Sequence, residues 1–340
     1  MSGTAPWSIA DADKWCRSIA WQMGFNYVPS SAVNTTEFWQ AESFDVRTIG
    51  KELRLAADTG FNSCRVFIQE LVWEHDPPGF RERFARFLNI AAENALSVMP
   101  VLFDDCAFSK KAPFLGRQDE PVPGRMMTSW TASPGHDRVR DRAAWPRLEG
   151  YVTDMVGAFA HDRRIVMWDL YNEPGNEGMG DGSLALVEAA FGWARAVRPE
   201  QPLTVGVWSQ AESYSRLNAT ILRESDISSF HSYAGLADTQ AIMDKLSAGG
   251  RPTVCTEWMA RPLGSRVETH LAAFQQRGVG CYLWGFVNGR TQTHIPWEFV
   301  KQSGCTDEWF HDLFRGDGTP YRAEEMETLR RLSPLSRRPA

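Results

Sequence analysis

The chain has 340 residues, of which 43% are hydrophobic, and a formal net charge of -6 with a pI near 5.7. This length suits one large domain or two ordinary ones, and the hydrophobic content supports a substantial core. The mild acidity gives no support to nucleic-acid binding, which usually requires a basic surface.

The N-terminal segment carries Asp and Lys where a signal peptide needs an apolar run, and no stretch approaches the roughly 20 apolar residues of a membrane span. We therefore expect a cytoplasmic protein without a membrane partner; the sequence leaves its oligomeric state open. The cysteines are far apart and form no C-x-x-C pair, so we expect buried free thiols rather than disulfides or a zinc site. They are Cys16, Cys64, Cys106, Cys255, Cys281 and Cys305.

Strand-like runs alternate with segments of helical spacing along the whole chain. This alternation predicts an α/β fold, a parallel (β/α)8 TIM barrel, with a doubly wound open sheet as the structural competitor. We expect one domain over residues 1–332 and a disordered tail over 333–340. The eight expected strands are 21–29, 61–68, 96–103, 165–171, 203–208, 227–233, 253–258 and 279–286, and the expected helices are 46–59, 80–94, 145–161, 183–197, 239–246 and 265–277.

Two connections are unusually long. Residues 104–144 follow the third strand and are rich in Pro, Gly and charge, and residues 288–312 follow the eighth. Loops beyond about 15 residues without structure of their own are usually functional lids or disordered. We expect the first to be a lid over the catalytic face. The segment 209–226 shows only a short helical stretch, so this unit fits the barrel pattern least well.

Two glutamates stand at the carboxyl ends of apolar strands. Glu173 follows the fourth run within Asn-Glu-Pro, and Glu257 ends the seventh within Thr-Glu-Trp. Parallel α/β folds place active sites at these strand ends. Two such carboxylates can share glycoside cleavage, one protonating the leaving oxygen while the other attacks the anomeric carbon or activates water. Taken singly, each is more simply a solvated strand-end residue; the matched pair favours catalysis.

Other strand-end residues suit the same site. Arg65 lies in an apolar strand and needs a carboxylate partner, for which Glu257 is the natural candidate. His231 and Tyr233 alternate on the sixth strand, so both side chains point the same way. A strand histidine is more often a satisfied core residue, and Trp284 is equally suited to the core, although flat aromatic faces also stack on sugars. The substrate-binding candidates are Arg65, Asn172, His231, Tyr233, Trp284, Asp104, Trp208 and Asn288.

In order and spacing these motifs resemble the retaining β-glycosidases of glycoside hydrolase clan A, especially family 5, over about residues 20–330. The resemblance implies that Glu173 is the general acid/base and Glu257 the nucleophile. It further implies that Asn172 holds the sugar 2-hydroxyl, that Arg65 braces the nucleophile and that Tyr233 hydrogen-bonds it. By the same resemblance, His231 contacts the acid/base region, and Trp284 forms the floor of the subsite for the reacting sugar.

The third strand departs from the family pattern, which commonly has a sugar-contacting histidine near the end of the third or fourth strand. Here Phe103 is followed by Asp104 and Asp105. Asp104 is suited to binding sugar hydroxyls or a positively charged substituent, and equally to an N-cap or a loop salt bridge. The sugar is therefore left open.

From this sequence we expect retaining, double-displacement hydrolysis of β-linked oligosaccharides or glycosides, in carbohydrate metabolism or polysaccharide degradation, without metal or organic cofactor. The long loop favours a pocket and exo action; an endo-acting β-1,4-glycanase of glucanase, mannanase or xylanase type is the alternative. A non-catalytic sugar-binding barrel would not need both glutamates. An aldolase or isomerase would more often show a strand lysine, a metal cluster or a phosphate-binding loop.

Overall fold

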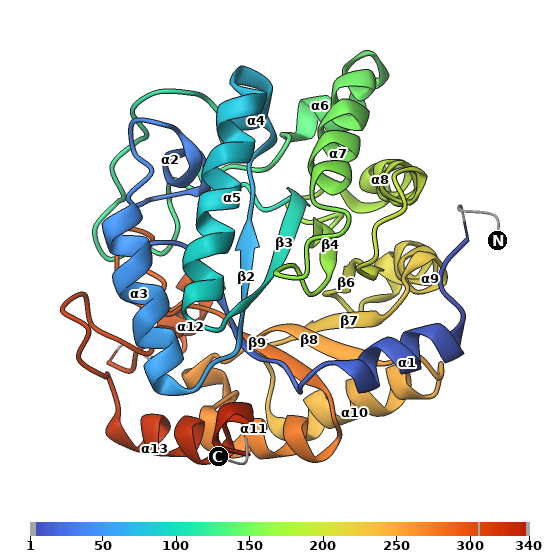
Figure 1. The fold of residues 1–340 in the computed structure, drawn as a ribbon. Helices are drawn as coiled ribbons and strands as arrows, with labels where there is room; N and C mark the ends of the chain where they lie inside the picture. The colour runs from blue at the N-terminus through green and yellow to red at the C-terminus, as the bar shows by residue number, and fades with distance from the viewer. Residues whose placement is uncertain (1–4, 305–306, 338–340) are drawn as a thin grey trace.

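The computed structural model describes residues 5–304 and 307–337. Its centre is one sheet of parallel strands that curls into a barrel, and helices surround it (Figure 1). The strand order is β5-β4-β3-β2-β1-β9-β8-β7-β6. The strands are β1 (Met23–Tyr27), β2 (Ser63–Phe67), β3 (Ser97–Asp104), β4 (Trp168–Asn172), β5 (Leu203–Thr204), β6 (Gly206–Val207), β7 (Ser228–Ser232), β8 (Thr253–Trp258) and β9 (Gly280–Leu283).

The barrel closes through the run that contains β5 and β6. β5 pairs with β4, and β6 pairs with β7, while only Val205 separates the two short strands. The Val205 N–H donates to Ser225 Oγ at 3.4 Å. The eight expected strands are therefore confirmed as a (β/α)8 TIM barrel, the fifth in two pieces, and the doubly wound open sheet is excluded.

The helices lie outside the barrel and cover the apolar outward faces of its strands (Figure 1). α3 coincides with the expected helix 46–59, and it ends at Gly60 in the left-handed conformation, φ 104°. The α-helices are α1 (Ile9–Ser18), α2 (Thr35–Trp39), α3 (Val46–Thr59), α4 (Glu70–His75), α5 (Pro77–Glu93), α6 (His136–Arg140), α7 (Trp145–Ala158), α8 (Leu184–Ala196), α9 (Ser215–Glu224), α10 (Leu236–Ser247), α11 (Val267–Gln276), α12 (Glu298–Gln302) and α13 (Ala323–Leu332). The 3-10 helices are η1 (Arg142–Ala144), η2 (Gly180–Ser183), η3 (Glu212–Tyr214), η4 (Arg261–Leu263) and η5 (Pro334–Arg337).

The uncertain unit after the fifth strand contains a full helix, α9, which buries Leu217, Thr220 and Ile221 against the barrel. Their spacing is helical, but only two of the three side chains are strongly apolar, which explains the weak pattern. At the chain's end, residues 334–337 form η5. Residues 338–340 lie outside the described part, so the disordered tail stays a prediction.

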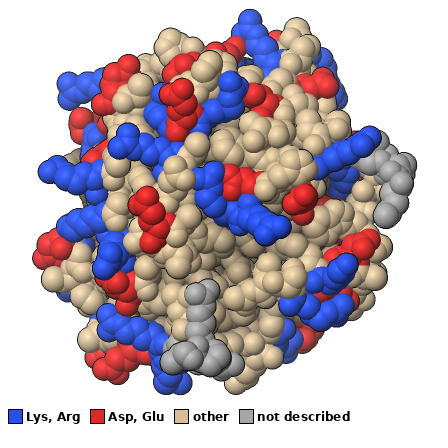
Figure 2. Space-filling model, in the orientation of Figure 1, with Lys and Arg blue, Asp and Glu red and all other residues tan. Residues whose placement is uncertain are grey.

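At the amino-terminal end of the barrel, α1 packs Ala12 against a cluster that includes Met99, Val254 and Tyr282. The described cysteines are free thiols; four are buried, as expected, whereas Cys16 is partly exposed, and Cys305 lies outside the described residues. No described helix is both long and apolar enough to cross a bilayer. On the face shown in Figure 2, Lys and Arg are interspersed with Asp and Glu.

Candidate active site

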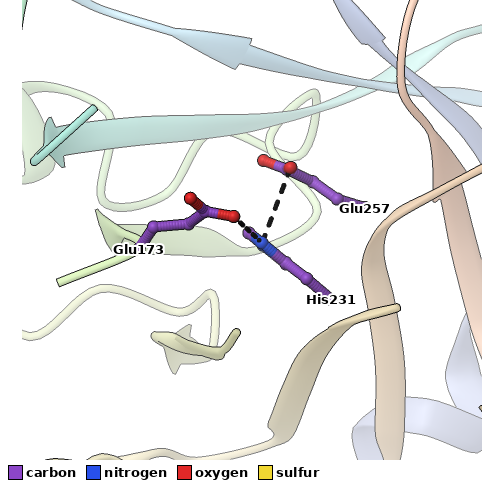
Figure 3. A group of neighbouring side chains, drawn as sticks. All are labelled: Glu173, His231 and Glu257. Carbon is purple, nitrogen blue, oxygen red and sulfur yellow. Dashed lines mark hydrogen bonds and ion pairs between the residues drawn. The ribbon is translucent and has the colours of Figure 1, made fainter. Parts of the chain in front are cut away.

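Glu173 follows the last residue of β4, and its backbone is strained. Its φ of 41° lies in the left-handed region, which side chains other than glycine rarely adopt. Such strain persists where surrounding structure enforces it, and it is concentrated at functional sites. The turn continues through Gly175, φ 87°, and the Glu173 side chain points toward His231 (Figure 3). Its side chain is 13% exposed.

Glu257 lies on β8 beside a register shift. Phe230 pairs with Cys255 but His231 pairs with Glu257, so Thr256 is an extra residue on β8. Bulges of this kind re-aim side chains next to active sites. Figure 3 shows the result, with His231 between the two glutamates. One ligand-type atom of each residue lies within 4.8 Å of the other two, so oxygens of Glu173 and Glu257 are close neighbours.

Arg65 connects four strands at the base of the site. Its guanidinium is fully buried and lies 2.8 Å from Asp169 Oδ2 and 2.7 Å from Glu257 Oε1. Nη1 also donates to Asn26 Oδ1, and Nη2 to Asn172 Oδ1, both at 2.7 Å. Burying an unpaired guanidinium is very costly, so the strand must supply carboxylates. The expected Glu257 partner is confirmed, and Asp169 is a second.

The Glu173 carboxyl group has partners on both oxygens. His231 Nδ1 lies 2.8 Å from Oε1. On Oε2, Asn176 Nδ2 donates at 2.7 Å and the Cys106 thiol at 3.3 Å. Burial raises the pKa of Glu173, against the lowering effect of these donors and of Arg65. A carboxyl group with a raised pKa is suited to carry a proton near neutrality.

Burial lowers the pKa of His231 to about 4, so its imidazole is neutral. Its Nε2 has no hydrogen-bond partner among the described residues. A neutral ring has one N–H, and placing it on Nδ1 lets it donate to Glu173, while Nε2 keeps only a lone pair. An unpaired buried lone pair costs less than an unpaired N–H.

Glu257 sits in a more cationic environment than Glu173. Its Oε2 accepts from the Tyr233 hydroxyl at 2.7 Å, while Oε1 faces Arg65. Burial raises the pKa of Glu257, and the charge of Arg65 and the Tyr233 hydrogen bond oppose this effect. Direct contact with a fixed cation favours the ionised form of Glu257. The two glutamates therefore differ in their contacts, because the Arg65 guanidinium hydrogen-bonds Glu257 and not Glu173.

A cavity opens on this pair. It is lined by both glutamates, Asn172, Tyr233 and Trp284, and by side chains from the two long connections. Trp284 is mostly buried and packs edge-on against Phe67, with ring centroids 5.6 Å apart. The lining residues that come from the long connections are Asp104, Cys106, Phe108, Met126, Met127, Trp130, Trp297 and His311.

Asp104 lines the cavity, but protein groups already use its oxygens. Oδ1 accepts from the Cys106 backbone N–H and from Asn172 Nδ2, both at 2.9 Å. Oδ2 accepts from Trp130 Nε1 at 2.8 Å. Burial raises the pKa of Asp104 to about 7. Through these hydrogen bonds Asp104 connects the long loop to Asn172. This arrangement fits a structural partner of the loop better than a residue whose oxygens are free to bind a sugar.

Two predicted substrate-binding residues neither line the cavity nor, in the described part of the chain, form a hydrogen bond to Glu173 or Glu257 as Arg65 and His231 do. Trp208 donates from Nε1 to the carbonyl of Pro174 at 2.9 Å and packs on Tyr214. Asn288 uses its backbone N–H to bond Phe314 O at 2.8 Å. Their sugar contacts stay predictions, whereas the remaining candidates surround the two glutamates.

Sequence reasoning missed four residues that contact the predicted site residues. Asn26 and Asp169 hold Arg65, and Cys106 and Asn176 hold Glu173. Asp169 carried a signal, because a carboxylate in an apolar strand beside a buried arginine predicts a pair. Cys106 and Asn176 lie in loops, where spacing gives no information about contacts.

Glu173, His231 and Glu257 also present enough ligand atoms for a metal ion. These three residues are nevertheless poorly suited to bind a metal ion. The guanidinium of Arg65, 2.7 Å from Glu257 Oε1, places a fixed positive charge beside any cation bound there. With its Nδ1–H donated to Glu173, His231 has no lone pair facing the other two ligands.

Known proteins of the same fold share this architecture. The exo-beta-1,4-mannosidase from Opitutaceae bacterium strain TAV5 superposes with a TM-score of 0.64 at 19% identity, covering 99% of this chain; this chain spans 62% of its length. GH5_18 from Streptomyces cattleya, in complex with GlcNAc, superposes with a TM-score of 0.61 at 15% identity, and the match covers 94% of this chain and 82% of that protein. The endo-1,4-beta-D-mannanase from Thermotoga petrophila RKU-1 superposes with a TM-score of 0.61 at 14% identity, and the match covers 93% of this chain and 100% of that protein.

No curated protein matches the sequence. The family described as cellulase (glycosyl hydrolase family 5) matches residues 24–290, which is most of the chain and includes both glutamates. Members of this family are retaining glycosidases. The chain therefore belongs to glycosyl hydrolase family 5 and is a retaining glycoside hydrolase.

Proposed function

We propose that this protein is an exo-acting retaining β-glycosidase in which Glu257 is the nucleophile and Glu173 the general acid/base. The observation that carries the proposal is the closely spaced glutamate pair, each in a different electrostatic environment. Retaining enzymes hold their carboxyl groups about 5–5.5 Å apart, whereas inverting enzymes need about 6.5–9.5 Å to admit a water. One oxygen of Glu173 lies within 4.8 Å of one oxygen of Glu257, and this closest approach favours the shorter separation.

In the first step, ionised Glu257 attacks the anomeric carbon of the sugar. Arg65 and Tyr233 hold its two oxygens, so the attacking group is fixed before substrate arrives. Protonated Glu173 gives its proton to the departing glycosidic oxygen, and a glycosyl ester forms on Glu257. In the second step Glu173, now ionised, takes a proton from water, whose oxygen attacks the anomeric carbon and releases Glu257 with net retention.

Exo action is supported by contacts that join the two long connections beside the cavity. Met127 N donates to Thr291 O at 2.8 Å, and Lys301 Nζ donates to Gly124 O at 2.7 Å. Gln292 bonds three backbone groups of the other loop, in residues 122, 124 and 125. A wall that two loops build together closes one side of the site, and a pocket binds chain ends rather than chain interiors.

A small glycoside or oligosaccharide is the proposed substrate, handled in the cytoplasm; cell fractionation tests that location. Two of the described neighbours are named for mannoside cleavage, so β-mannosides belong first in a panel of aryl β-glycosides that also holds glucose, galactose, xylose and glucuronic acid. Exo action predicts release of single sugars from end-labelled oligosaccharides. Internal cuts with intact aryl glycosides would overturn it.

The Glu173→Ala variant tests the catalytic assignment. It should lose most activity, and azide should restore part of it on substrates with good leaving groups, because azide replaces the water that Glu173 activates. Arg195→Met, at the opposite end of the barrel, serves as a control and should keep its activity without any response to azide. An azide-insensitive Glu173→Ala variant with near-normal activity would contradict the proposal.

A further inference from the structure

We propose that Cys106 is a positioning residue for Glu173, whose Oε2 it holds through its thiol in both protonation states of the acid/base. The proposal rests on the function assigned above to Glu173. It gives a role to a side chain that sequence reasoning treated only as a buried thiol.

The geometry around Cys106 is that of a built contact. Its Sγ lies 3.3 Å from Glu173 Oε2 and receives weak contacts from Asn176 Nδ2 at 3.4 Å and Asn172 Nδ2 at 3.6 Å. The Cys106 backbone N–H is fixed by Asp104 Oδ1 at 2.9 Å. Cys106 itself is 5% exposed and lines the catalytic cavity. Both its backbone and its side chain are therefore held against the acid/base.

The chemistry of a thiol suits this position. Asn176 Nδ2 can only donate, so it supports Oε2 well only while this oxygen carries no proton. A thiol is a weak donor and a weak acceptor, and it rotates about its Cβ–Sγ bond. It can donate to the carboxylate and then accept from the carboxylic acid. Because both bonds are weak, neither form of Glu173 is held so firmly that the proton cannot leave.

The thiol stays protonated throughout this cycle. Burial raises the pKa of Cys106 well above its ordinary value, and the nearby Asp104 and Glu173 add to the effect. Cys106 is therefore an S–H donor and not a competing thiolate nucleophile. Its hydrogen bond lowers the pKa of Glu173, against the upward effect of burial.

The test compares Cys106→Ala and Cys106→Ser by the pH dependence of kcat/KM on the best aryl β-glycoside of the panel. The alkaline limb reports the acid form of Glu173. Cys106→Ala removes a donor to the ionised form, so this limb should move to higher pH, by about 0.5 unit for a weak hydrogen bond. Cys106→Ser keeps a donor, so its limb should lie at or below the wild-type pH.

A second readout uses leaving groups. Acid assistance matters most for poor ones, so Cys106→Ala should reduce kcat/KM about tenfold on an alkyl glycoside, a fraction of the ~10²–10⁴ supplied by general acid catalysis. On a dinitrophenyl glycoside of the same sugar, its loss should be much smaller. The matched control is Cys64→Ala, which removes a thiol buried among apolar side chains and should leave both readouts unchanged.

The outcomes separate this inference from the proposed function. If wild type hydrolyses none of the glycosides, or if Glu173→Ala stays fully active, the proposed function fails. Wild type can be active and depend on Glu173 while the alkaline limb of kcat/KM lies at the same pH in wild type and in both Cys106 variants. In that case only the inference about Cys106 fails. Equal losses on both leaving groups would also overturn it, since they would indicate a general packing defect.

Discussion

Replacing Arg65 with methionine should destabilise and inactivate the protein together, because this residue neutralises two buried carboxylates. The Arg65 and Asp169 side chains are 0% exposed and that of Glu257 is 5% exposed. Methionine keeps much of the volume but leaves Asp169 and Glu257 without a cation. Removing one partner of a buried ion pair typically costs about 3–5 kcal/mol. We expect a loss of this size in the free energy of unfolding at pH 8.

The loss should shrink in acid, which distinguishes electrostatics from packing. Without Arg65, burial holds the pKa of both carboxyl groups above their unfolded values near 4. The folded variant then binds more protons than the unfolded chain, so its stability falls as pH rises above about 4. Each unit by which a folded pKa exceeds the unfolded one adds about 1.4 kcal/mol to this fall. The penalty at pH 5 should therefore be smaller than at pH 8.

Urea unfolding at the two pH values, with kcat/KM on the panel's best substrate, provides the assay. Activity of the folded fraction should fall roughly 10²-fold or more, the scale of one lost charge-stabilising group. Arg195→Met is the matched control, because Arg195 is also buried and lies 3.3 Å from Asp226, before β7 at the opposite barrel end. It should lose stability but keep activity. An Arg65→Met penalty below about 1 kcal/mol, or one equal at both pH values, would refute the reasoning.

Three further changes test the surroundings of the pair. Tyr233→Phe removes the 2.7 Å hydroxyl donor from Glu257 Oε2 and should lower kcat roughly tenfold, with a loss of about 1–3 kcal/mol in the free energy of unfolding; an unaltered kcat would contradict the role of this contact. Trp130→Phe keeps the ring packing but removes the donor to Asp104 Oδ2, so the free energy of unfolding at pH 8 should fall by about 1–3 kcal/mol, and no change would mean that this bond is dispensable. Gln292→Ala removes the amide that joins the two loops, so limited proteolysis should cut residues 105–144 faster than in wild type, and equal rates would count against the shared wall.

The barrel could be predicted because its information is local. Apolar runs and helix stops such as Gly60 mark each unit, and the carboxyl ends of parallel strands must meet at one face. That rule alone brought Glu173, Glu257 and Arg65 together. The break at Val205 could not be predicted, since no periodicity marks this residue or its contact with Ser225.

The contacts made by loop residues could not be predicted from the periodicity of the sequence. Cys106 and Asn176 meet Glu173 only because two loops fold over β4, and no periodicity links them. Trp208 was predicted from its place at a strand end, yet its indole bonds the Pro174 carbonyl beside the cavity. Position on a strand predicts the face to which a side chain belongs, while its partners depend on the loops above it.

Glu257 should form a covalent bond with the sugar during each catalytic cycle. A 2-deoxy-2-fluoro aryl glycoside of the preferred sugar slows release of the glycosyl-enzyme, so the ester can be located by peptide mass spectrometry. We expect one fluorosugar per chain on the peptide containing Glu257, and none in Glu257→Gln. A fluorosugar on Glu173 or another residue, or turnover without any covalent adduct, would contradict the account.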